Sequence, residues 1–120
     1  MKKRYIQILV VLVLVLSLTA NVYAGESYVE ENRSVGLPAI TVIGNTAKCK
    51  ATVNYQGLYI NATLELWQGN TLVASWTNSG MDSVTVSGNA TIIHGLTYTL
   101  TVSGTAGGVE FTPRSITRTL

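Results

Sequence analysis

Side chains that could carry out chemistry are scarce in this 120-residue sequence. Cysteine, histidine and aspartate each occur once, as Cys49, His94 and Asp82. Catalytic triads and zinc sites need several such groups brought together. The Gly-x-Ser-x-Gly pattern of a serine nucleophile does not occur either. These counts argue against most enzymes, and we expect no catalytic residue, no cofactor and no metal ligand.

The remaining candidates for chemistry have simpler structural explanations. Glu65 and Glu110 could form a carboxylate pair of the glycosidase kind, but both fall on predicted outward, polar strand faces, where a charge is simply solvated. His94 comes directly before Gly95 and has no second metal-ligating residue near it in sequence, so we expect an exposed turn histidine. Cys49 alternates with apolar residues and is predicted to be a core residue. The alternative for Cys49 is a lone thiol that cross-links a partner.

Two aromatic side chains could bind a partner. Tyr59 and Trp67 lie on the outward side of the same predicted strand. Aromatic rings on a sheet face can stack on sugars or fill a groove in a partner protein. The alternative is that they cover the sheet edge or lie under the N-terminal segment.

The first 24 residues have the three parts of a secretory signal peptide. Residues 2–4 are basic, residues 6–18 are almost purely aliphatic, and Val22-Tyr23-Ala24 suits cleavage. The aliphatic run is shorter than the ~20 residues that span a bilayer. We therefore expect secretion after cleavage at Ala24, with no stable membrane anchor. Five basic and six acidic side chains remain after residue 24, which does not support binding of nucleic acid.

The rest of the chain divides into a flexible N-terminal arm and one β domain. Residues 25–39 are polar and follow neither a helical nor a strand period, which predicts the arm. Residues 40–120 are rich in β-branched and aromatic residues, with Gly and Asn at short intervals, which predicts strands and turns. The expected strands cover residues 40–43, 48–55, 59–67, 71–77, 83–87, 97–103 and 109–118. About seven strands without a helix indicate an antiparallel β-sandwich.

Residues that pair across an antiparallel ladder lie on the same face of the sheet, and this predicts the pairing in the hairpin around Gly69. A three-residue loop over residues 68–70 pairs Leu66 with Leu72 and Ala62 with Trp76, which separates an apolar face from a polar one. This register buries Trp76 and exposes Trp67. A later hairpin turns at Gly107-Gly108, and Pro113 predicts an edge or a bulge in the last strand.

Residues 92–100, Ile-Ile-His-Gly-Leu-Thr-Tyr-Thr-Leu, resemble the tyrosine corner of immunoglobulin-like and fibronectin type III sandwiches. The resemblance implies that Gly95 forms the turn and that the Tyr98 hydroxyl bonds to upstream backbone. Four further segments are distinctive: Leu64-Glu65-Leu66-Trp67, Ala74-Ser75-Trp76, residues 84–88 and residues 107–110. Through them, residues 40–120 are similar to a family of small secreted Firmicutes proteins of unknown function. This second resemblance implies export and a sandwich, and it transfers no activity.

Export, a sandwich fold and the lack of a catalytic set favour a non-enzymatic extracellular binding or interaction module. Its partner would be a protein or a polysaccharide at the cell surface. A released antibacterial or toxin-like effector is the alternative, although the nearly neutral mature chain lacks the basic amphipathic character of agents that attack membranes directly. A small hydrolase has the least support.

We predict that secreted protein begins at Gly25, because the aliphatic run ends before a cleavable Val22-Tyr23-Ala24. N-terminal sequencing of protein from the culture medium checks this. Recovery of a chain that still begins at Met1 would contradict it.

Overall fold

The computed structural model describes residues 33–120, and the predicted signal peptide and the first part of the predicted arm lie outside them. All pairings are antiparallel. The strands are β1 (Arg33–Val35), β2 (Ala39–Ile43), β3 (Thr46–Gln68), β4 (Thr71–Thr91), β5 (Thr97–Ala106), β6 (Val109–Glu110) and β7 (Arg114–Thr119). In the described part of the chain, no helix is long and apolar enough to cross a membrane.

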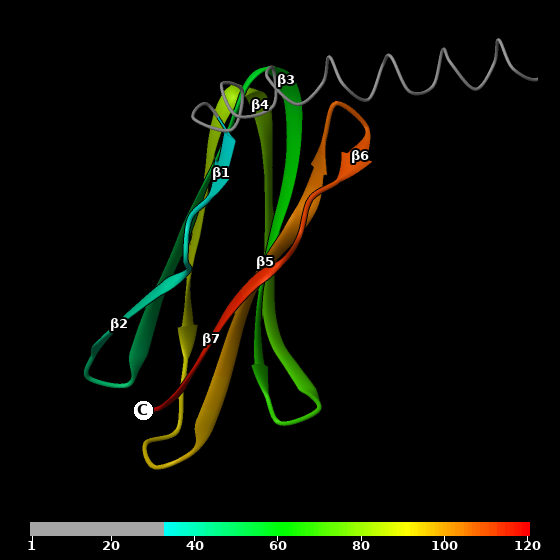
Figure 1. Ribbon diagram of the computed structural model, residues 1–120. Helices are drawn as coiled ribbons and strands as arrows, with labels where there is room; N and C mark the ends of the chain where they lie inside the picture. Colours follow the sequence, from blue (N-terminus) through cyan, green and yellow to red (C-terminus); the bar gives the residue numbers. More distant parts are fainter. Residues whose placement is uncertain (1–32) are drawn as a thin grey trace, which may run out of the picture. The chain divides into compact units, whose positions relative to one another are not determined.

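The β3–β4 hairpin contributes to both layers of the sandwich. Residues 46–55 of β3 pair with β1, with β2 and with residues 82–91 of β4. Residues 59–68 of β3 pair with residues 71–81 of β4 and with β5, which in turn pairs with β6 and β7. Figure 1 shows β3 and β4 turning at the same end of the molecule. The fold is therefore the predicted all-β antiparallel sandwich, but its two layers are halves of one folded sheet.

The bend explains why four of the predicted strands are halves of two long ones. Three residues of β3, 56–58, have no partner in β4, whereas Asp82 and Met81 are consecutive. Asp82 adopts a φ of 69°, and its Oδ1 accepts a hydrogen bond of 2.7 Å from the Gly57 N–H. Asp and Gly tolerate this left-handed region better than most residues. The single aspartate thus stabilises the turn from one layer to the other.

The core fills the space between the layers. In β3, odd-numbered residues face inward before the bend and even-numbered residues after it. The most completely buried side chains are Ile60, Leu64, Leu66, Leu100, Val53, Val86, Val102 and Cys49. Cys49 is only 2% exposed, which agrees with a core position.

The predicted register of the first hairpin is wrong by two residues. The loop is Gly69-Asn70, and Gln68 pairs with Thr71. Val73 is then an extra residue in a bulge, so that Leu66 pairs with Ala74 and Leu64 with Trp76. The extra residue reverses the alternation of β4 between Leu72 and Ala74. From Ala74 onward the apolar and polar faces are those predicted, although the partners differ, but the inward position predicted for Leu72 is wrong: it pairs with Trp67 on the outward face and is 45% exposed.

Trp76 closes the side of the sandwich where β4 doubles back. It is half-buried against the core, and a Cβ at Gly88 would overlap its indole ring. The two residues lie in opposite halves of β4, so the indole spans the two layers. Trp67 is also partly buried rather than freely exposed, and its Nε1 donates to Glu65 Oε1 at 3.2 Å.

Of two predictions near the ends of the described region, the one for residues 33–35 is wrong and the one for Pro113 is confirmed. Residues 33–35, within the predicted arm, form β1 and pair with β3, so the sandwich begins before Ile40. Gly36 extends this contact, because its N–H donates to the Thr52 carbonyl at 2.8 Å. Pro113 does interrupt the last strand as predicted: β6 ends at Glu110 and β7 begins at Arg114.

The tyrosine corner has the hydrogen bond that its motif predicts. Tyr98 is 3% exposed, and its hydroxyl accepts a hydrogen bond of 2.9 Å from the Ile93 N–H. Gly95, in the turn between them, has a φ of 96°. The corner therefore fixes the connection from β4 to β5.

We predict that Tyr98→Phe lowers the free energy of unfolding by about 1 to 3 kcal/mol, because the Ile93 N–H loses its acceptor. Urea denaturation of the variant and the wild type measures the difference. An unchanged midpoint would show that the hydroxyl makes no net contribution.

Candidate functional site

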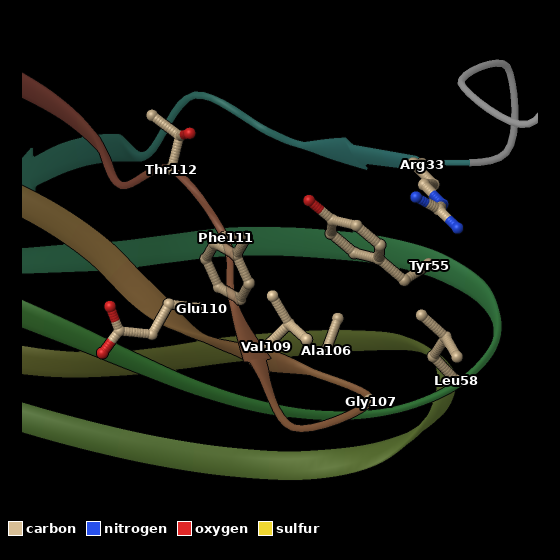
Figure 2. Close-up of a pocket in the computed structure, with 9 residues that line it drawn as sticks. All are labelled: Arg33, Tyr55, Leu58, Ala106, Gly107, Val109, Glu110, Phe111 and Thr112. Atoms are coloured by element: carbon tan, nitrogen blue, oxygen red, sulfur yellow. The ribbon is translucent and has the colours of Figure 1, made fainter. Parts of the chain in front are cut away.

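An open pocket of about 460 Å³ lies at the end of the sandwich where β3 bends. Figure 2 shows its walls, which come from β1, from the bend of β3 and from the β5–β6 hairpin. The lining residues are Arg33, Tyr55, Leu58, Ala106, Gly107, Val109, Glu110, Phe111 and Thr112. Segments far apart in the sequence therefore meet at this one end.

A pair of aromatic rings forms the floor of the pocket. Tyr55, the last inward residue of β3 before the bend, stacks on Phe111, with ring centroids 5.9 Å apart and an interplanar angle of 24°. Phe111 is buried, and its N–H donates to the Gly104 carbonyl at 3.1 Å. The two rings come from opposite layers, so this contact also closes the end of the core.

Polar groups surround this aromatic floor. The Arg33 guanidinium lies 5.9 Å from the centroid of the Tyr55 ring, within reach of a cation–π interaction. Figure 2 shows the guanidinium on one side of Tyr55, and Glu110 beyond Phe111 on the other. Arg33, Glu110 and Thr112 are all exposed. The pocket thus combines an apolar base with a cation, a carboxylate and hydroxyl groups at its rim.

The predicted carboxylate pair is not brought together. Glu65 pairs with Thr101 and Glu110 with Thr105, four residues further along β5. Glu65 and Glu110 are therefore separated by about 13 Å along the strand direction. Across the sheet they are separated by a further two strand spacings of about 4.8 Å each. Glycosidase pairs lie about 5 to 9.5 Å apart. The two glutamates therefore lack the geometry for that reaction.

The predicted aromatic pair lies on one face but at opposite ends of it. Tyr59 is 50% exposed, and its hydroxyl donates to Ser79 Oγ at 3.1 Å. Trp67 is eight residues further along the strand, about 27 Å at about 3.4 Å per residue. One small ligand cannot contact both rings. Tyr59 lies at the same end as the pocket, because its carbonyl accepts a hydrogen bond of 2.8 Å from the Gly107 N–H.

The other chemically active side chains have structural roles. His94 is exposed at its turn, and its Nε2 lies 2.8 Å from the Gly44 carbonyl oxygen. Residues 33–120 contain no group of three or more His, Cys, Asp or Glu side chains that could hold a metal ion. Burial raises the pKa of the Cys49 thiol to about 11, so the thiol is protonated at neutral pH.

A second hollow of about 550 Å³ lies against the layer formed by the first half of β3 and the second half of β4. It is beside Lys48 and Lys50 of β3 and Ser87 to Asn89 of β4. Within the described part of the chain, its lining contains no aromatic side chain and no carboxylate. The pocket lined by Tyr55 and Phe111 therefore offers a more varied set of binding groups than this second hollow.

Sequence reasoning did not find the pocket. Arg33 falls within the predicted arm, and its position over Tyr55 depends on the pairing of Arg33 with Tyr55 in the β1–β3 ladder. Phe111 lies between Glu110, which ends β6, and the Pro113 interruption, so no alternation indicates its direction. The available signal was the Gly107-Gly108 turn, which correctly placed this hairpin at one end of a strand pair.

A scan against protein-family models and a search of curated proteins found no match. Among solved structures, the chain is similar to OgpA from Akkermansia muciniphila, with 11% identity and a TM-score of 0.51. A catalytically inactive OgpA in complex with an O-glycopeptide substrate gives the same values. Each match covers 71% of this chain and 27% of OgpA. A DUF3823 family protein from Bacteroides ovatus has 16% identity and a TM-score of 0.49, over 72% of this chain and 54% of that chain.

At 11% identity, the similarity to OgpA shows a shared fold alone. The chain spans only 27% of the length of OgpA. The resemblance to a small secreted Firmicutes family stays a prediction, because no family model matches.

We predict that Cys49 makes the protein less stable as the pH rises from about 9 to about 11. The folded protein holds the thiol proton up to a pKa of about 11, whereas the unfolded chain releases it near the ordinary value of 9.0. The unfolded state therefore binds fewer protons than the folded state in this pH window. The free energy of unfolding falls by up to about 2 to 3 kcal/mol as a result.

Urea denaturation at pH 8, 9, 10 and 11 checks this prediction, with Cys49→Ala as the control for the tyrosines and lysines that titrate in the same range. The difference between wild type and variant should shrink as the pH rises. A difference independent of pH would show that the thiol titrates normally.

Proposed function

We propose that this protein is a secreted, non-enzymatic binding module that recognises a polysaccharide at the cell surface. The observation that carries the proposal is the open pocket with the stacked Tyr55 and Phe111 at its base. Export rests on the predicted signal peptide. The sandwich supports the proposal by holding the pocket on strands and short turns, which position binding groups more precisely than long loops.

The chemistry of the pocket fits a sugar better than a purely apolar ligand. A sugar ring has apolar C–H faces and a rim of hydroxyl groups, so it needs an apolar or aromatic surface together with hydrogen-bonding groups. Here Tyr55, Leu58 and Val109 supply apolar surface. Arg33 supplies donors, the Glu110 carboxylate supplies acceptors, and Thr112 supplies a hydroxyl.

Catalysis has less support than binding. Among residues 33–120, Glu110 is the only carboxylate that lines the pocket, and no histidine, cysteine or aspartate of this region lines it. Asp82 lies near the bend, but its carboxylate accepts the Gly57 N–H. A lone exposed carboxylate can orient a ligand, whereas glycoside hydrolysis by the common routes uses two.

We expect Arg33→Ala to weaken binding to a polysaccharide by about tenfold or more, because a charge-assisted hydrogen bond contributes about 1.5 to 3 kcal/mol. Glycan-array screening of the secreted protein identifies a ligand, and titration calorimetry measures its affinity. Arg118→Ala is the matched control, because it removes the same charge from an exposed position on β7.

The double variant Tyr59→Ser, Trp67→Ser tests the alternative surface in the same assay. If this variant loses binding and Arg33→Ala keeps it, the outward face of β3 is the site rather than the pocket. If no glycan is bound and the protein kills neighbouring cells instead, the released effector replaces the binding module.

A further inference from the structure

The second hollow lies on the outer face of the layer that contains β2, the first half of β3 and the second half of β4. Lys48 and Lys50 occupy its middle strand, and both are exposed. Their side chains point away from the core, because Cys49 between them is buried. Trp76 lies on the other face: it fills the space where a Cβ of Gly88 would point, and Gly88 pairs with the buried Cys49. The outer face of the hollow is therefore open to a ligand.

No carboxylate of residues 33–120 lies beside the two lysines. This region has three acidic side chains. Glu65 and Glu110 pair with β5 in the other layer, and Asp82 accepts the Gly57 N–H at the bend. The two neighbouring ammonium groups therefore repel each other with no counter-charge from this region. An anion that binds between them replaces this repulsion with two attractive interactions.

Polar side chains in the hollow also differ from those nearer the bend on the same face. Near the bend they bond to one another: Thr52 to Thr85 at 3.0 Å, and Asn54 to both Ser34 and Ser83. Within residues 33–120, the polar lining residues of the hollow form no such pair. These residues are Thr41, Lys48, Lys50, Ser87 and Asn89. Their donor groups can therefore bind a ligand without first breaking a bond between side chains of this region.

The donors are spaced to surround one small anion. Residues two apart on a strand lie about 6.8 Å from each other. Each lysine has a flexible four-carbon stem, so the ammonium groups of Lys48 and Lys50 can both reach an anion between them. In the neighbouring strands, Thr41 and Asn89 flank Lys48, and Ser87 flanks Lys50. A tetrahedral anion has oxygens directed to several sides and can use these donors together, whereas a planar carboxylate suits the fork of an arginine.

We propose that the second hollow binds the phosphate group of a phosphorylated sugar. A phosphate monoester carries a charge of about −1.5 to −2 at pH 7 and three acceptor oxygens, which matches two ammonium groups. A sulfate ester carries a single charge and matches them less well. Ala39 and Ile43 also line the hollow, and Ile43 is 59% exposed, so apolar surface for the C–H groups of a sugar lies beside the lysines. Binding of phosphate depends on the hollow alone, whereas the choice of a sugar as its carrier rests on the proposed function.

NMR titration of ¹⁵N-labelled protein produced from the full 120-residue chain tests the proposal. The probes are inorganic phosphate, glucose 6-phosphate and glucose 6-sulfate at constant ionic strength, because salt screens exposed charges. The amide signals of Lys48, Lys50, Ser87 and Asn89 should shift and saturate with both phosphates. Glucose 6-phosphate should bind more tightly than inorganic phosphate, and glucose 6-sulfate should bind several-fold more weakly than glucose 6-phosphate.

Lysine variants assign the binding to the hollow. Lys48→Gln and Lys50→Gln should each raise the dissociation constant of glucose 6-phosphate about fivefold, the upper range for one exposed ion pair. The double variant should lose the saturable shifts, whereas Lys48→Arg keeps the charge and should keep most of the affinity. Arg118→Gln is the matched control: it removes one positive charge from an exposed position on β7 and should bind like the wild type.

The outcomes separate this site from the pocket. Arg33→Ala, which tests the pocket, should bind inorganic phosphate at the hollow like the wild type. Shifts that do not saturate, that survive the double lysine variant or that occur only around Arg33 would overturn the hollow as a phosphate site. Equal affinity for glucose 6-sulfate and glucose 6-phosphate would overturn the selectivity for phosphate. Saturable binding of inorganic phosphate with no gain from the sugar would overturn the sugar, and with it the part that rests on the proposed function, while the phosphate site would stand.

Discussion

The structure depends on one constraint: a long paired hairpin has to fold back on itself without losing its hydrogen bonds. β3 and β4 stay paired through the bend, so both layers of the sandwich share one ladder. The bend works because residues 56–58 add length to one strand only, and because Asp82 accepts the Gly57 N–H in a left-handed conformation. The inward face of β3 changes from odd-numbered to even-numbered residues across this turn, since the three extra residues reverse the parity.

The two sides of the folded sheet are closed by different means. On the β4 side, the Trp76 indole occupies the space that a side chain at Gly88 would need, and Asn78 bonds to the Thr85 carbonyl. Both contacts join the two halves of a single strand. On the other side, Arg114 joins β7 to β1 through a single hydrogen bond. The layers are therefore joined by the continuous strands β3 and β4 and by these side contacts, without a disulfide, because the one cysteine, Cys49, is free.

The candidate site follows from the same bend. Tyr55 is the last inward residue before β3 turns, so its ring lies at the end of the core instead of inside it. The end is covered by Phe111, which the short β5–β6 hairpin brings across, and by Arg33 from β1. Binding groups gather here because β1, the bend of β3 and the β5–β6 hairpin meet at this end, and the stacked Tyr55 and Phe111 line the open pocket between them.

The sequence by itself determined the fold class, most strand positions, most of the inward and outward faces, the burial of Cys49 and Tyr98, and the hairpin at Gly107-Gly108. All of these follow from alternation and turn residues, which act over a few neighbouring positions. The tertiary structure alone decided the Val73 bulge, which puts Leu72 on the outward face opposite Trp67 and Ala74 on the inward face opposite Leu66. It also decided the joining of four short strands into β3 and β4, and the pairing of Arg33 with Tyr55. These depend on contacts between residues far apart in the chain, where backbone hydrogen bonding outweighs local composition.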